Sequence, residues 1–182
     1  MKKYNILFLF VFFTAALTAQ KINWMSMDEA LIAQEKKPRK IFMDAYTDWC
    51  GPCKLLDRNT FTNKDLVDFV NENYYAVKFN AEGTEEITYK GTPFANPSYD
   101  PARKGRRNSQ HHFATAMRIQ GYPSIVFFNE TGDLIQPIVG YKTAQQLEIF
   151  LKMIANDDYK GLTTQEAWAA YQENFQSTFK EG

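Results

Sequence analysis

Cys50 and Cys53 are the only cysteines among the 182 residues, and Gly51 and Pro52 separate them. At the start of a helix this spacing brings two thiols within disulfide-bonding reach without movement of the backbone. A helix N-terminus also stabilises a thiolate, because its first N–H groups lack partners within the helix. A disulfide that closes so short a loop adds little stability to a domain of this size. The pair therefore indicates thiol–disulfide exchange, in which Cys50 is the exposed nucleophile and Cys53 the resolving thiol.

The residues on either side of the pair predict the strand and the helix that position it. Residues 41–46 form a short apolar run typical of a buried strand, with one acid, Asp44, inside it. Residues 47–51 end the strand, and a helix is expected to begin near Pro52, because proline suits the first turn. The cysteines are thus expected where a buried strand leads into a helix.

The rest of the chain alternates helical and strand patterns. A first helix is expected over residues 24–35, with Ser26 and Glu29 as a capping box and Leu31 and Ile32 facing inward. Further helices are expected after Asn63, over 109–120 and over 143–155, and further strands over 74–80, 124–129 and 134–139. The predicted fold class is α/β, with a central mixed sheet of four to five strands and helices on both faces.

The string Trp49-Cys50-Gly51-Pro52-Cys53-Lys54, in this strand-to-helix context, resembles the thioredoxin superfamily. The resemblance covers about residues 24–156. It is closest to the exported thioredoxin-like branch, which includes the C-terminal periplasmic domain of the transmembrane thiol–disulfide reductant carrier. It implies a thioredoxin fold, protein thiols or disulfides as partners, a membrane thiol-electron carrier as a candidate redox partner, and no cofactor.

The same resemblance implies roles for further residues. Asp44 matches the buried acid that exchanges a proton with the resolving cysteine, and Lys78 matches the lysine that partners this acid. Pro123 matches the cis-proline that faces the cysteines. The residues implied in substrate binding are Trp49, Gly51, Pro52, Tyr122 and Pro123.

Each of these residues also has a simpler interpretation. Burial would raise the pKa of Asp44 towards neutral pH, as a proton relay needs, but backbone amides could instead satisfy the carboxylate. Lys78 could reach solvent from a strand edge, and Pro123 could be an ordinary trans turn proline. Cys50, Cys53, His111 and His112 could in principle bind zinc. Adjacent histidines rarely converge on one ion with a distant cysteine pair, so we expect no metal, and expect both histidines at a helix start or in solvent.

Two segments extend the chain beyond the family pattern. An insert at about 82–110, rich in proline, glycine and basic residues, cannot form a long helix. It is either a solubilising surface loop or a border of the Cys50 groove that selects partners through Phe94, Tyr99, Arg103 and Arg106. Residues 157–182 form a helical extension, in which Thr164 caps a helix. Its aromatic stripe of Trp168, Tyr171, Phe175 and Phe179 packs on its own domain or docks another protein.

The N-terminus predicts export. Lys2 and Lys3 precede an apolar run over 6–17 and small residues up to Ala19, which is the layout of a secretory signal peptide at 1–19. An uncleaved anchor is the alternative. We expect a periplasmic or otherwise exported protein whose thioredoxin-like domain spans 20–156.

The global charge gives no indication of nucleic acid binding, since 21 basic residues balance 21 acidic ones. We expect a monomer. Gly-Pro between the cysteines resembles the reducing members of the superfamily, so a protein-disulfide reductase or isomerase is the leading hypothesis. A disulfide-introducing oxidase and a non-enzymatic binding module are the alternatives.

Overall fold

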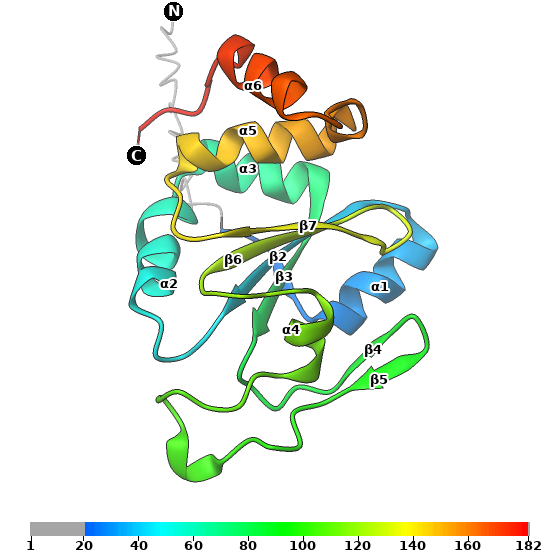
Figure 1. Ribbon diagram of the computed structural model, residues 1–182, viewed down its shortest axis with the longest axis vertical. Helices are drawn as coiled ribbons and strands as arrows, with labels where there is room; N and C mark the ends of the chain where they lie inside the picture. The colour runs from blue at the N-terminus through cyan, green and yellow to red at the C-terminus, as the bar shows by residue number, and fades with distance from the viewer. Residues whose placement is uncertain (1–20, 182) are drawn as a thin grey trace, which may run out of the picture.

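A five-stranded mixed sheet forms the centre of the protein (Figure 1). The computed structural model describes residues 21–181, so the predicted signal peptide lies outside the described residues. The strands lie in the spatial order β1 (Trp24–Met25), β3 (Tyr74–Asn80), β2 (Lys40–Tyr46), β6 (Ser124–Phe128) and β7 (Leu134–Val139). The first three are parallel to one another, and β6 and β7 are antiparallel to their neighbours. The predicted α/β class and mixed sheet are confirmed.

Six α-helices are found among the described residues. They are α1 (Met27–Lys36), α2 (Gly51–Leu55), α3 (Lys64–Asn73), α4 (His112–Ala116), α5 (Ala144–Ala155) and α6 (Gln165–Asn174). A π-helical turn, Leu56–Thr60, continues α2, and short 3-10 turns cover Pro101–Arg103 and Asp158–Gly161. In this part of the chain no helix is both long and apolar enough to cross a bilayer.

Side chains of β2 alternate between two hydrophobic cores. Phe42 packs in the core beneath α3 and α5, whereas Ile41 and Met43 pack in the core beneath α1 and α4. Helices therefore cover both faces of the sheet, as predicted (Figure 1). Asp44, two residues after Phe42, is directed to the α3–α5 face, where Leu56 of the π-helical turn after α2 also contributes to the core.

Side chains cap the helices where the sequence predicts. Ser26 and Glu29 form the expected capping box of α1, and Asn63 accepts a hydrogen bond from the N–H of Leu66 at 3.1 Å. Thr143 and Gln146 form a second capping box at the start of α5. These side chains mark where the three helices begin.

The predicted first helix is wrong at its start and at Ile32, whereas Leu31 packs against the core as expected. Residues 24 and 25 form β1, and the helix begins at Met27. Its buried face consists of Met27, Ala30 and Gln34, spaced by three and four residues. This face turns Ile32 outward, where it is 53% exposed.

The helix predicted over 109–120 is also wrong in its length. His111 caps α4, and the helix ends after Ala116. Arg118 then adopts a left-handed backbone conformation with φ of 58°. A helix cannot continue through that conformation, yet the turn still buries Ile119.

The insert leaves the sheet at the end of β3 and returns at α4. It contains the hairpin β4 (Ile87–Tyr89) and β5 (Thr92–Phe94) and, as predicted, no long helix. Its two ends meet, because the N–H of His111 donates to the carbonyl of Ala81 at 2.8 Å. Figure 1 shows the insert as one lobe at the bottom of the view.

The C-terminal segment packs on its own domain. The ring of Trp168 stacks on Phe150 of α5 with centroids 5.6 Å apart. Phe179 is buried, although it was expected on the helical stripe. It lies instead on an extended tail, since α6 ends at Asn174 and Phe175 has extended backbone angles.

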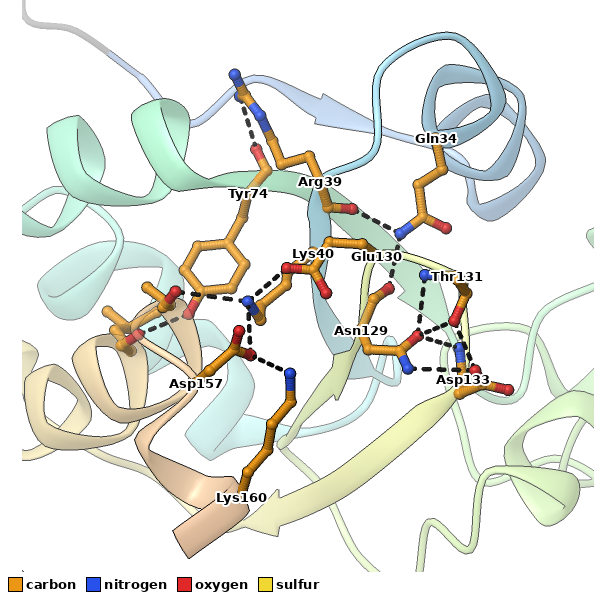
Figure 2. Close-up of polar contacts among 12 residues, drawn as sticks. Gln34, Arg39, Lys40, Tyr74, Asn129, Glu130, Thr131, Asp133, Asp157 and Lys160 are labelled. Carbon is orange, nitrogen blue, oxygen red and sulfur yellow. Dashed lines mark hydrogen bonds and ion pairs between the residues drawn. The ribbon is translucent and has the colours of Figure 1, made fainter.

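A polar network holds together the end of the sheet at which the central strand β2 begins (Figure 2). The ammonium of Lys40, only 6% exposed, lies 2.6 Å from Glu130 and 3.0 Å from Asp157. It also donates to the carbonyl of Ala155 at the end of α5. This buried lysine thus connects β2 to the turn between β6 and β7 and to the end of α5.

Candidate active site

Cys50 and Cys53 form a disulfide at the start of α2, with Cα atoms 5.3 Å apart. Cys50 is the N-cap of the helix and Pro52 lies in its first turn. The N–H of Cys53 donates to the sulfur of Cys50 at 3.1 Å. The unpaired N–H groups of a helix start are thus directed at the sulfur that the sequence assigns as the nucleophile.

The expected exposure of Cys50 is wrong for this disulfide form. Both cysteines are 2% exposed. The disulfide draws the Cys50 sulfur towards Cys53 and against the N–H of that residue, and so away from solvent. The neighbouring Gly51 and Pro52 are exposed and form the accessible surface of the motif.

Asp44 and Lys78 form an ion pair within the sheet, where their strands are in register. Lys78 Nζ lies 2.6 Å from Oδ2 of the fully buried Asp44. The same ammonium also pairs with Asp57 on the π-helical turn after α2. Lysine, not backbone amides, therefore partners Asp44, and Lys78 does not simply extend to solvent.

Aromatic rings surround the Lys78 ammonium. It lies 5.0 to 5.3 Å from the ring centroids of Trp24, Tyr46 and Phe61. The electron-rich faces of these rings stabilise a cation and hold it beside Asp44. Burial alone would lower the pKa of Lys78, but Asp44 and Asp57 raise it, so the lysine stays charged.

Burial controls the acidity of Asp44. It raises the pKa of this carboxyl from 3.8 to about 6, and the charge of Lys78 only partly opposes this effect. Oδ1 of Asp44 is buried and accepts no hydrogen bond from the described residues. The carboxyl can therefore hold or release a proton near neutral pH.

The Tyr122–Pro123 peptide bond is cis. Pro123 is buried at the start of β6, and its carbonyl accepts a hydrogen bond from the N–H of Gly140 at 2.8 Å. The ring of Tyr122 packs edge-on against Trp49 with centroids 6.1 Å apart. Two residues implied in substrate binding, Trp49 and Tyr122, are thus in direct contact and half-buried.

Glu82, which sequence reasoning missed, fixes the position of Trp49. Its Oε2 accepts hydrogen bonds from Nε1 of Trp49 at 2.7 Å and from the N–H of Asn108 at 2.8 Å. Glu82 also raises the pKa of Tyr122, although burial is the larger cause, and together they bring it to about 12. No local pattern marks this acid, because its partners lie 33 and 26 residues away in the chain.

The insert meets the site through its basic part and not through Phe94. Arg107 lies over the ring of Trp49, 4.7 Å from the centroid. Tyr99, Arg103 and Arg106 share a narrow cleft with Trp49. Phe94 instead packs on Phe113 in the core, so its expected place beside the cysteines is wrong.

The two histidines lie at a helix start. His111 is buried, accepts the N–H of Phe113 at Nδ1 and contacts the carbonyl of Glu85 through Nε2. His112 is the first residue of α4 and is exposed. Both cysteine sulfurs are bonded to each other, and across residues 21–181 no group of three or more His, Cys, Asp or Glu side chains is arranged to hold a metal ion.

Comparison with known proteins identifies the family. Residues 27–155 match the thioredoxin-like domain family, so the chain belongs to that family. It is 24% identical over 142 residues to the thiol:disulfide interchange protein DsbD of Pectobacterium atrosepticum, covering 76% of this chain and 20% of that protein. It is 29% identical over 77 residues to Thioredoxin-T of Drosophila melanogaster, covering 42% of this chain and 46% of that one. The chain thus spans less than half the length of either relative.

Solved structures share the fold. A thioredoxin-fold protein from Helicobacter pylori superposes with a TM-score of 0.56 at 17% identity, covering 75% of this chain and 81% of that one. The DsbH oxidoreductase superposes with a TM-score of 0.54 at 16% identity, covering 79% of this chain and 90% of that one. These likenesses show that the domain has a thioredoxin fold.

Proposed function

We propose that the protein is a thiol–disulfide oxidoreductase that reduces or isomerises disulfides of other proteins. The observation that carries this proposal is the Cys50–Cys53 disulfide at the start of α2. The relation to DsbD, a thiol:disulfide interchange protein by name, supports it. The intact cysteine pair, together with the buried acid Asp44, disfavours a purely structural binding module.

In the proposed reaction the dithiol form donates two electrons to the substrate disulfide. The Cys50 thiolate attacks one substrate sulfur, and the other leaves as a thiolate and takes up a proton from water. Cys53 then loses its proton and attacks the Cys50 sulfur. The Cys50–Cys53 disulfide forms, and the second substrate thiol is released.

Asp44 is proposed to accept the Cys53 proton, and to return it when an external dithiol reduces the pair again. A pKa of about 6 suits both directions near neutral pH. Lys78 is proposed to hold Asp44 in place. Trp49, Gly51, Pro52, Tyr122 and Pro123 are proposed to contact the substrate backbone.

We further propose that the protein is exported to the periplasm as a monomer and exchanges electrons with a membrane thiol carrier. The expected signal peptide at 1–19 and the relation to DsbD support this. The proposed domain organisation is a thioredoxin-like domain over 20–156, with the insert at 82–110, and an extension over 157–182.

A disulfide-reduction assay on a protein substrate, driven by excess dithiol, tests the function. Wild type is expected to accelerate reduction and Cys50→Ser to abolish the acceleration. Without the external dithiol, which would cleave it, reduced Cys53→Ser is expected to accumulate a mixed disulfide with the substrate, because the resolving thiol is gone. A wild type that neither reduces nor becomes trapped would refute the proposal. The redox potential of the pair separates a reductase from an oxidase.

A further inference from the structure

Four cationic side chains lie together on the insert near Trp49. Arg103, Lys104, Arg106 and Arg107 occupy a stretch in which residues 101–107 are all exposed. None of the four forms an ion pair with another residue of the described range, 21–181. We call these four residues the basic patch.

The structure fixes the patch beside the active site. Arg107 lies over Trp49, the residue before Cys50, and Glu82 bonds both Trp49 and Asn108. Asn108 also closes the loop that carries the patch. Its Oδ1 accepts the N–H of Asp100 at 2.9 Å, and its Nδ2 donates to the carbonyl of Asp100 at 2.8 Å.

The nearby acids do not neutralise the patch. Asp48 accepts a hydrogen bond from Asn80, and Glu82 accepts those of Trp49 and Asn108. Asp100 caps the 3-10 turn through the N–H of Ala102. These donors are uncharged, so the three acids keep their own charge, but none of them forms an ion pair with the four cations. The cationic groups are therefore able to pair with a ligand.

We infer that the basic patch selects substrates whose reactive disulfide is flanked by acidic residues, an inference that rests on the proposed exchange at Cys50. Guanidinium groups bind carboxylates through paired hydrogen bonds, which gives direction as well as attraction. A substrate that presents its sulfur to Cys50 would place neighbouring side chains along Trp49 and the patch. Acidic flanks therefore speed the encounter, and basic flanks slow it.

Three synthetic peptides test the inference. They contain the same intramolecular disulfide and differ only in flanking Glu, Gln or Lys residues, and each is mixed with the reduced protein. The second-order rate of mixed-disulfide formation is measured at about 10 mM and about 1 M salt, between which the Debye length falls from about 30 Å to about 3 Å. At low salt the Glu peptide is expected to react roughly 5-fold or more faster than the Gln peptide, and the Lys peptide more slowly than both. At high salt the rates are expected to converge.

The variant R103E/R106E is expected to reverse this order, and its urea unfolding curve reports whether the fold is intact. R103Q/R106Q is expected to abolish the preference without reversing it. The matched control is K36E/K37E, which changes the net charge equally. Both control lysines are exposed at the end of α1, before β2 begins, whereas Cys50 follows the end of β2.

Equal wild-type rates with all three peptides would overturn the inference and leave the proposed function standing. So would a preference that persists at high salt, or one that K36E/K37E reverses as strongly as R103E/R106E. No reaction with any peptide would instead refute the proposed function.

Discussion

Lys78 donates a hydrogen bond to Asp44 at 2.6 Å, yet it does not restore the ordinary acidity of that carboxyl. Burial in the centre of β2 dominates and raises the pKa to about 6. A neutral Asp44 is thus favoured in the folded state at mildly acidic pH. This has a measurable effect on stability.

Asp44→Asn is expected to stabilise the disulfide form above pH 7. The stability that protonated Asp44 contributes is fully present below pH 3.8 and is lost as the pH rises through about 6. The amide of the variant would carry no buried charge, and Lys78 would keep its ion pair with Asp57. The gain at pH 8 is on the order of 3 kcal/mol, since one pKa unit corresponds to about 1.4 kcal/mol. Urea unfolding at pH 4 and pH 8 measures it.

Asp57→Asn is the matched control, because Asp57 binds the same lysine but is 47% exposed. It is expected to change the pH dependence of stability much less than Asp44→Asn does, because the charge of Asp57 is the smallest of the causes that act on the pKa of Asp44. If the difference in unfolding free energy between Asp44→Asn and wild type stayed constant from pH 4 to pH 8, the raised pKa of Asp44 would be contradicted.

Glu148→Gln is expected to loosen the C-terminal tail. Glu148 is buried in α5 and accepts the N–H groups of Thr178 and Phe179 at 2.8 and 3.0 Å. Burial alone would raise its pKa, but the hydrogen bonds of Lys152, Ser177 and these amides lower it to about 2. Its contribution is therefore present above pH 4.5 and is lost as the pH falls through about 2.

We expect Glu148→Gln to cost about 2 kcal/mol at pH 7, as for hydrogen bonds to a charged group, and to cost little near pH 2. Urea unfolding measures the loss, and limited proteolysis after Asn174 reports tail release. Glu173→Gln, at an exposed position of α6, serves as the control and should change neither. Equal protease resistance of wild type and Glu148→Gln would show that Glu148 does not hold the C-terminal tail in place.

Lys40→Ala is expected to destabilise the fold more than Lys64→Ala. Both lysines form ion pairs, but the Lys40 side chain is 6% exposed and that of Lys64 is 78% exposed. Removing Lys40 leaves Glu130, Asp157 and the carbonyl of Ala155 without this donor (Figure 2). The expected loss is about 2 kcal/mol for Lys40→Ala, and Lys64→Ala is expected to cost much less, because solvent screens its ion pair.

Thermal and urea unfolding compare the two variants. Lys40→Met keeps most of the apolar stem and is expected to recover part of the loss. Equal losses for Lys40→Ala and Lys64→Ala would show that the network in Figure 2 adds nothing beyond a surface pair.

Local signals mark three of the helix starts and predicted the disulfide-forming pair. Ser26, Asn63 and Thr143 cap helices through atoms three residues away, so the chain segment itself carries the information. The strand-to-helix context of Cys50 and Cys53 is local in the same way.

Contacts across the chain could not be predicted. Ile32 turned outward because packing, and not its hydrophobicity, chose the buried face of α1. Glu82 and Glu148 bind groups 26 to 33 residues away. Lys152, one turn after Glu148, is a local partner, but nothing near either acid marks these distant partners. The burial that sets the acidity of Asp44 likewise depends on strands from three parts of the chain.

The hydrogen bond between His111 and Ala81 holds the two ends of the insert next to each other, so the insert leaves and rejoins the domain at one place. The sheet does not depend on the length of a loop whose ends already meet, and the entropy of closing a longer loop grows only slowly with its length. Segments of other length and charge could be grafted in place of the exposed stretch 101–106, while the hairpin keeps Ile87 and Phe94 on the core and β2, β3 and β6 stay paired. The chemistry at Cys50 and the choice of partner could then be engineered separately.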